Sequence, residues 1–112
     1  MAERNAAAEE EEVKLKTLTH IPQEVRDAVY NRDSFDNWPC CIYCGKPRGI
    51  EVHHFIERSR GGLGIEENLV CLCKKCHTRI HQGDEELNEF VREYLSEHYD
   101  GWDENNLIAR KE

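Results

Sequence analysis

Apolar residues recur along the chain with two different periods, and the shorter period predicts a pair of strands in its middle. Apolar and polar residues alternate across residues 49–56, as in a strand with one buried face. Asn68 is followed by an apolar run at residues 69–72, and residues 68–71 are predicted to form a second strand that pairs back on the first. The intervening residues 57–67 contain three glycines and are expected to form a loop.

The helical period appears on both sides of these strands. Isoleucine, valine and alanine side chains share one face across residues 21–32, which predicts a short amphipathic helix. Another helix is expected from residue 73 or 74 to about residue 82, ended by Gly83. An apolar stripe over residues 84–98 predicts a final helix with Asp84 as its N-cap. Together these elements predict a small α+β fold.

One domain is expected after an acidic N-terminal segment. Residues 1–18 are rich in alanine and glutamate and have hardly any apolar periodicity, so we expect them to be disordered. The domain then covers residues 19–112, and Phe35 and Trp38 are available to cap its small core. It consists of a core and of a C-terminal helix with its tail, at residues 40–83 and 84–112.

The charge is unevenly distributed along the chain. The net charge of −8 argues at first against a nucleic-acid partner, because phosphate binding depends on basic side chains. Residues 40–83, however, carry seven basic and four acidic side chains, whereas residues 84–112 carry three and ten. Since charges are screened over roughly 8 Å at physiological salt, a phosphate bound near the middle of the chain would meet local positive charge.

The sequence predicts neither a membrane partner nor an oxidising compartment. No run approaches the roughly 20 apolar residues of a membrane-spanning helix. No apolar signal sequence follows Met1, so we expect a reducing, cytoplasmic environment. In that environment Cys-x-x-Cys pairs hold a metal ion more often than they form disulfides.

Two cysteine pairs predict a closed zinc site. Four thiolates complete the tetrahedral coordination that structural zinc prefers, and each pair has the spacing of a zinc knuckle. The predicted ligands are Cys41, Cys44, Cys73 and Cys76. The two cysteines left over, Cys40 and Cys71, are expected to be small buried apolar residues.

Four histidines predict a second, open metal site. His77 and His81, four residues apart, share one face of the expected helix from residue 73 or 74. His53 would arrive from the first strand as a third nitrogen ligand, and three ligands leave positions for water and substrate. His54 is then free to act as a base. Because consecutive strand residues point to opposite faces, His53 and His54 can serve one site only if the strand bends or ends there.

The chain closely resembles the HNH endonucleases in the segments VHHFIERSRGG and ENLVCLCKKCHTRIH and in its two cysteine pairs. The resemblance covers roughly residues 32–82. It implies a ββα-metal core of two short strands, a loop and a helix gripping one divalent ion, stapled here by zinc and flanked by N- and C-terminal helices. That ion would be Mg²⁺, Mn²⁺, Ni²⁺ or Zn²⁺, and an all-imidazole ligand set favours the last three over Mg²⁺.

The resemblance also implies roles for individual residues. His54 looks like the general base and Asn68 like the central asparagine of the family, which would tie the loop so that the base keeps its orientation. His53 takes the first ligand position, and His77 matches the helix ligand. His81 matches the extra helix histidine of the colicin-type nucleases.

The function implied by the resemblance is a metal-dependent endonuclease that nicks or cuts DNA and leaves 5′-phosphate and 3′-hydroxyl ends. Candidates for phosphate contacts are Arg58, Arg60 and Lys74. The chain is similar to small phage HNH proteins that act in genome packaging, which implies a terminase or another protein as a second partner. It also implies the cytoplasm of a bacterium or of a phage-infected host.

Two other functions share parts of this pattern. A non-catalytic zinc module that binds DNA or protein would keep the four thiols but would need no His54. A restriction-type nuclease would use the same core as a packaging nuclease, and the sequence leaves these roles open.

Overall fold

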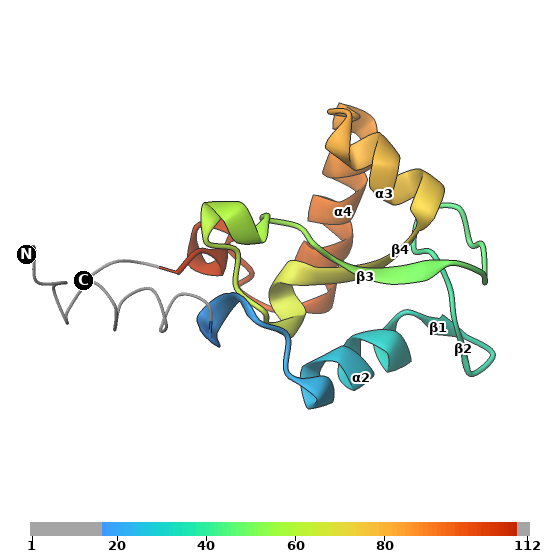
Figure 1. The fold of residues 1–112 in the computed structure, drawn as a ribbon, viewed down its shortest axis with the longest axis horizontal. Coiled ribbons are helices and arrows are strands. Elements are labelled where there is room, and N and C mark those ends of the chain that lie inside the picture. Colours follow the sequence, from blue (N-terminus) through green and yellow to red (C-terminus); the bar gives the residue numbers. More distant parts are fainter. Residues whose placement is uncertain (1–16, 110–112) are drawn as a thin grey trace, which may run out of the picture.

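A two-stranded antiparallel sheet lies at the centre of the domain. The computed structural model describes residues 17–109, so residues 1–16 of the expected disordered segment lie outside the described residues. The sheet consists of β3 (Ile50–His54) and β4 (Leu69–Cys73) (Figure 1). The predicted pair of strands, joined by a long loop, is therefore confirmed.

Helices cover both faces of this sheet. α2 (Gln23–Arg32) lies on one side of the sheet, and α3 (Lys74–His81) and α4 (Glu85–His98) lie on the other (Figure 1). Every residue of β4 is consequently buried, and from Leu69 to Leu72 alternate side chains contribute to the two separate core clusters. A strand covered on both faces gives an unbroken apolar run. The predicted second strand, at residues 68–71, ends two residues before Cys73 because residue 73 is already considered as the start of the following helix.

The three helices begin and end within a few residues of their predicted bounds. α3 follows β4 directly, with Cys73 as its N-cap. Asp84 caps α4 by accepting a hydrogen bond of 3.0 Å from the backbone N–H of Leu87. The apolar stripe of α4 is buried as expected, with its fully buried members being Leu87, Val91 and Leu95.

The expectation that Phe35 and Trp38 cap the core is wrong. They lie in a small hairpin formed by β1 (Ser34–Phe35) and β2 (Trp38–Pro39), and their side chains are 79% and 62% exposed. The two turn residues between them have φ angles of 53° and 66°, the left-handed conformation of a tight two-residue hairpin turn. The hairpin therefore turns both rings to solvent, and aliphatic side chains close the core instead.

A buried ion pair fixes α2 to the sheet and to α4. The side chains of Arg32 and Asp33 are 2.7 Å apart and are 11% and 0% exposed. Asp33 also accepts hydrogen bonds from the backbone N–H of Cys71 and from the hydroxyl of Tyr94, and Arg32 donates to the carbonyl of Leu69. Burial opposes the charge of Arg32, but Asp33 raises its pKa above the ordinary value. The start of β4 is thereby held in place.

Short 3₁₀ helices shape the loop between the strands and the tail after α4. The loop contains η1 (Arg58–Arg60) and η2 (Glu66–Asn68), and the tail contains η3 (Glu104–Leu107). The tail packs against the core, because Leu107 is buried and Trp102 Nε1 donates a 2.8 Å hydrogen bond to a carbonyl of η2. Among the described helices, none has the length and apolar character needed to cross a membrane.

Candidate active site

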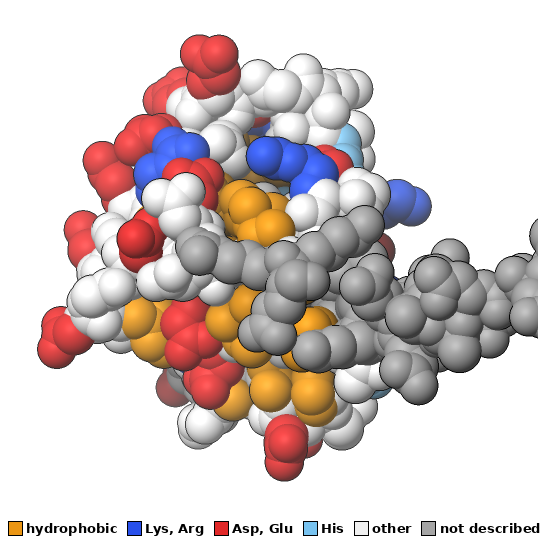
Figure 2. Space-filling view, turned by 90° about the vertical axis from the view of Figure 1, so that its left-hand side faces the viewer, with side chains coloured by type: hydrophobic (Ala, Val, Ile, Leu, Met, Phe, Trp, Pro, Cys, Tyr) orange, Lys and Arg blue, Asp and Glu red, His pale blue; other side chains and the backbone are white. Residues whose placement is uncertain are grey.

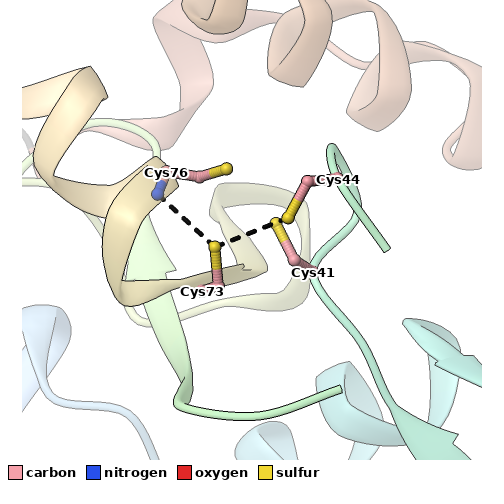
Figure 3. A group of neighbouring side chains, drawn as sticks. All are labelled: Cys41, Cys44, Cys73 and Cys76. Atoms are coloured by element: carbon pink, nitrogen blue, oxygen red, sulfur yellow. Dashed lines mark hydrogen bonds between the residues drawn. The ribbon is translucent and has the colours of Figure 1, made fainter. Parts of the chain in front are cut away.

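Four cysteine side chains converge from two segments of the chain (Figure 3). Cys41 and Cys44 come from the turn after β2, and Cys73 and Cys76 come from the end of β4 and the first turn of α3. Their sulfur atoms all lie within 4.8 Å of one another, and those of Cys44 and Cys73 are 3.5 Å apart. A disulfide requires about 2.05 Å, whereas tetrahedral zinc with bonds of about 2.3 Å separates its sulfurs by roughly 3.8 Å. The cluster therefore fits a structural zinc site.

Backbone geometry around these thiols is that of a zinc knuckle. Gly45, with a φ angle of 77°, makes the tight turn behind the first pair. Burial alone would raise the pKa of Cys73, but hydrogen bonds from the backbone N–H of Cys76 and from the neighbouring thiols lower it to about 7. The thiolate form that zinc requires is thus easier to reach at Cys73 than at an ordinary cysteine, whereas burial raises the pKa of Cys44 and Cys76. Outside the cluster, Cys71 is buried as expected, and Cys40 is half-buried.

Three histidine side chains form a second cluster between β3 and α3. The ligand nitrogens of His53, His77 and His81 all lie within 4.8 Å of one another. The ring centroids of His53 and His77 are 4.6 Å apart, and those of His53 and His81 are 5.8 Å apart. The structure therefore brings together the three side chains that the sequence proposed as ligands of an open site.

His53 has the chemistry of a metal ligand. It is 4% exposed, and its Nε2 atom has no hydrogen-bond partner among the described residues. Burial, followed by the neighbouring imidazoles, lowers the pKa of His53 to about 3, so the ring is neutral at pH 7. A buried polar atom without a partner is costly, and a neutral imidazole nitrogen facing two others is a donor set that fits a divalent ion.

His54 points from the opposite face of β3. Its Nε2 lies 3.0 Å from the carbonyl oxygen of Thr19, and a carbonyl can only accept. The neutral ring consequently carries its proton on Nε2 and keeps the lone pair on Nδ1. Burial lowers the pKa of His54 below its ordinary value; the bond to Thr19 raises it, and the charges of Arg58 and Arg26 lower it.

An open cavity at the end of β3 joins the two histidine faces. β3 pairs with β4 on one edge, and its other edge carries no strand among the described residues. A cavity of about 160 Å³ lies there. Its lining includes side chains from both faces of the strand: Val52, His53, His54, Glu57, Arg58, His77 and His81. Because β3 ends at His54, both consecutive histidines reach one cavity, which meets the condition set by the strand geometry.

Asn68 holds the loop behind this cavity. Its side chain is fully buried, accepts a 2.8 Å hydrogen bond from the N–H of Ile56, and donates to the carbonyls of Ile56 and Leu63 at 3.1 and 2.8 Å. Gly62 packs against the same backbone, since a Cβ there would lie 1.7 Å from the carbonyl oxygen of Ile56. Asn68 therefore acts on the loop's shape and is too deeply buried to meet a substrate.

The three basic residues proposed for phosphate contacts do not lie together on the cavity. Arg58 is exposed and lines it, and the charge of Arg58 acts on the ring of His54. Arg60 and Lys74 are also exposed, but neither belongs to its lining. Position in the loop alone does not distinguish these arginines.

Two contacts at the site were missed from sequence. The carboxylate of Glu51 lies 2.8 Å from Nδ1 of His77, and the backbone carbonyl of Thr19 meets His54. Glu51 precedes His53 by two residues, so strand alternation places it on the same face. That signal was available in the sequence. The contact with Thr19 spans 35 residues and had no sequence signal.

Comparison with known proteins identifies the family. The model of the HNH endonuclease family matches residues 41–83. The chain is 34% identical over 63 residues to Anaredoxin of Nostoc sp., a match that covers 56% of this chain and 83% of that protein. It is 42% identical over 45 residues to the type IV methyl-directed restriction enzyme EcoKMcrA of Escherichia coli, covering 40% of this chain and 16% of that enzyme. The matched segment contains both ligand clusters and the cavity, and residues 41–83 of this chain are an HNH endonuclease domain.

Proposed function

We propose that this chain is a metal-dependent endonuclease that hydrolyses phosphodiester bonds of DNA to 5′-phosphate and 3′-hydroxyl ends. The observation that carries the proposal is the meeting of three ligand-type imidazoles and a separate fourth imidazole at one open cavity. The experiment that tests it is metal-dependent cleavage of a DNA substrate.

His54 is the group that takes the proton. The carbonyl of Thr19 fixes the neutral ring with its lone pair on Nδ1, and the lowered pKa keeps that ring neutral near pH 7. A neutral imidazole beside the cavity can accept a proton from a water molecule that attacks the scissile phosphorus. The bond to Thr19 also restricts rotation of the ring, so the accepting atom keeps its direction.

His53, His77 and His81 would hold the catalytic divalent ion. Such an ion, when bound, supplies Lewis-acid stabilisation of the charge that develops on the phosphoryl group and on the leaving oxygen. The nitrogen donor set favours Mn²⁺, Ni²⁺ or Zn²⁺ over Mg²⁺, which prefers oxygen ligands. The four-thiol cluster would keep a separate zinc ion with a structural role.

Basic side chains favour binding of nucleic-acid phosphates on the cavity side. Arg58 lines the cavity and can contact a phosphate there, and Arg60 and Lys74 add positive charge on neighbouring elements. Acidic side chains are spread widely over the face shown in Figure 2, where lysine and arginine are few. We therefore place the DNA at the cavity and not on that face.

A supercoiled plasmid tests the proposal directly. The purified zinc-loaded chain is incubated with plasmid and with Mn²⁺, Ni²⁺, Zn²⁺ or Mg²⁺ in turn, and nicked and linear products are separated on a gel. End-labelling of the products reports whether the 5′ ends carry phosphate. Cleavage that depends on an added ion supports the proposal, whereas intact plasmid with every ion contradicts it and favours a zinc module that only binds.

A restriction-type nuclease is the second candidate role. The similarity to a methyl-directed restriction enzyme favours it, although the match covers only a small part of that enzyme. Cleavage of a methylated plasmid in preference to an unmethylated copy would support this role. A packaging role beside a phage terminase, in the cytoplasm of an infected cell, stays a prediction from the family resemblance; co-purification with a terminase subunit would test it.

A further inference from the structure

We propose that Glu51 is a positioning residue for the histidine site. Its carboxylate keeps the proton of the His77 ring on Nδ1, so that Nε2 of that ring points toward the ion. The proposal rests on the proposed function in that it concerns the same three histidines. It adds a fourth residue, from β3, that controls how one of them presents its lone pair.

The contact between Glu51 and His77 sets the tautomer of the ring. Oε2 of Glu51 lies 2.8 Å from Nδ1 of His77. An ionised carboxylate only accepts hydrogen bonds, so Nδ1 must carry the proton, and the neutral ring keeps its lone pair on Nε2. That Nε2 atom lies 2.8 Å from Nε2 of His81, inside the cluster of ligand nitrogens.

The fold presents Glu51 to α3 by strand alternation. Glu51 and His53 are two residues apart in β3 and therefore point to the same face. His77 contacts both, because its ring lies 4.6 Å from the ring of His53 and its other nitrogen meets the carboxylate. Glu57 offers no comparable bond to His81: the distance from its Oε1 to Nδ1 is 3.6 Å, beyond a good hydrogen bond.

A purely structural role explains the contact between Glu51 and His77 less well than a role in metal binding. The side chains of Glu51 and His77 are 54% and 26% exposed, and an exposed ion pair contributes little to stability. By contrast, a carboxylate that accepts from a metal-ligating histidine fixes its orientation and increases its basicity, and losing it typically weakens metal binding by roughly 10- to 100-fold. The expected effect therefore falls on metal affinity and leaves the fold intact.

Calorimetric titration of Ni²⁺ into the zinc-loaded full chain tests the proposal without any need for cleavage. Glu51→Ala should bind Ni²⁺ roughly 10- to 100-fold more weakly than the unaltered chain. Glu51→Gln, which keeps an acceptor oxygen but loses the charge, should fall between the two. Glu24→Ala removes an exposed carboxylate of α2 and is the matched control, expected to bind as the unaltered chain does. His77→Ala should abolish binding and so assign the titrated site.

Failure of this proposal and failure of the proposed function give different results. Equal affinity for Glu51→Ala and the unaltered chain would overturn the positioning role while leaving the nuclease proposal standing. If Glu51→Ala binds Ni²⁺ more weakly but the unaltered chain leaves the plasmid uncut with every ion, only the nuclease proposal is overturned. If the unaltered chain binds no Ni²⁺ at the histidines, both fall. Long-range ¹H–¹⁵N NMR of His77 gives a second readout, since the Nδ1–H form should dominate unless Glu51 is replaced.

Discussion

The two ligand clusters of this chain both include residues of α3, yet the thiol cluster is closed and the imidazole cluster is open. Four thiols surround one point, and three of the four cysteines are buried. The imidazole cluster has three members, of which only His53 is buried, and it opens on a cavity. A closed set of four ligands suits a structural ion, whereas three ligands beside a cavity leave room for water and a phosphate. By ligand count and exposure, the thiol cluster thus suits a structural ion and the imidazole cluster suits a catalytic ion.

Loss of zinc should have the largest effect. Cys76→Ser, or incubation with a strong chelator, should abolish the cooperative unfolding transition, because structural zinc in small domains contributes about 10–16 kcal/mol of apparent binding free energy. Thermal unfolding followed by circular dichroism, with zinc content measured in parallel, checks this. Cys40→Ser lies outside the cluster and is the control. A Cys76→Ser chain that unfolds at the temperature of the unaltered protein would remove the structural role of the thiols.

Replacement of the buried imidazole of His53 should not lower the stability of the fold. His53→Leu removes a buried nitrogen that has no partner, so the free energy of unfolding without added ion should be unchanged or should rise by about 1–3 kcal/mol. Binding of Ni²⁺ at the histidine cluster should be lost in the same variant. Denaturant unfolding and calorimetry measure the two effects. A strongly destabilised His53→Leu chain would mean that this cluster, too, is structural.

Removal of the hydrogen-bond donors of Asn68 should lower the free energy of unfolding by less than the loss of zinc does. Asn68→Asp keeps the acceptor for Ile56 N–H but leaves two buried carbonyls without a donor, each costing about 1–3 kcal/mol. Cleavage should slow as well, because the loop next to the cavity loses its anchor. Asn31→Ala, exposed on α2, is the matched control for denaturant unfolding and for cleavage. Equal stability of Asn68→Asp and the control would contradict the anchoring role.

The smallest expected effect concerns phosphate contacts. Arg58→Ala should weaken DNA binding and lower the slope of log affinity against log salt by about 0.9, the value for one lost phosphate contact. Arg60→Ala should change the slope less, because Arg60 does not line the cavity. Binding measured by fluorescence anisotropy at several salt concentrations compares the two. An equal change for both variants would show that the whole loop, and not the cavity edge, meets the DNA.

Sequence patterns predicted the elements well because local periodicity and capping decide them. The Asp84 cap, the buried stripe of α4 and the two cysteine pairs all depend on residues close in sequence. The same reasoning failed for Phe35 and Trp38, which pair across a two-residue hairpin turn and are both exposed. Apolar character alone does not say which face of a hairpin is covered.

The sequence predicted the candidate ligands of the site but not the groups that orient the histidine rings. Helical spacing placed His77 and His81 on one face, and the structure places the third predicted ligand, His53 of β3, within 4.8 Å of them. Contacts such as those of Glu51 with His77 and of Thr19 with His54 join segments 26 and 35 residues apart. Strand alternation places Glu51 on the face of His53, but which side chain of another element it meets depends on how the elements pack.

The central claim is that His54 acts on a bound phosphate at the cavity where the other three histidines hold an ion. Its most direct test is the single-turnover cleavage rate of a DNA duplex at saturating Mn²⁺ for His54→Ala, compared with His98→Ala, an exposed histidine of α4. We expect the rate to fall roughly 10²- to 10⁴-fold for His54→Ala, the usual contribution of a general base, with unchanged metal affinity. We expect no loss of rate for His98→Ala. A His54→Ala chain that cleaves at the rate of the unaltered protein would show that His54 is not the general base.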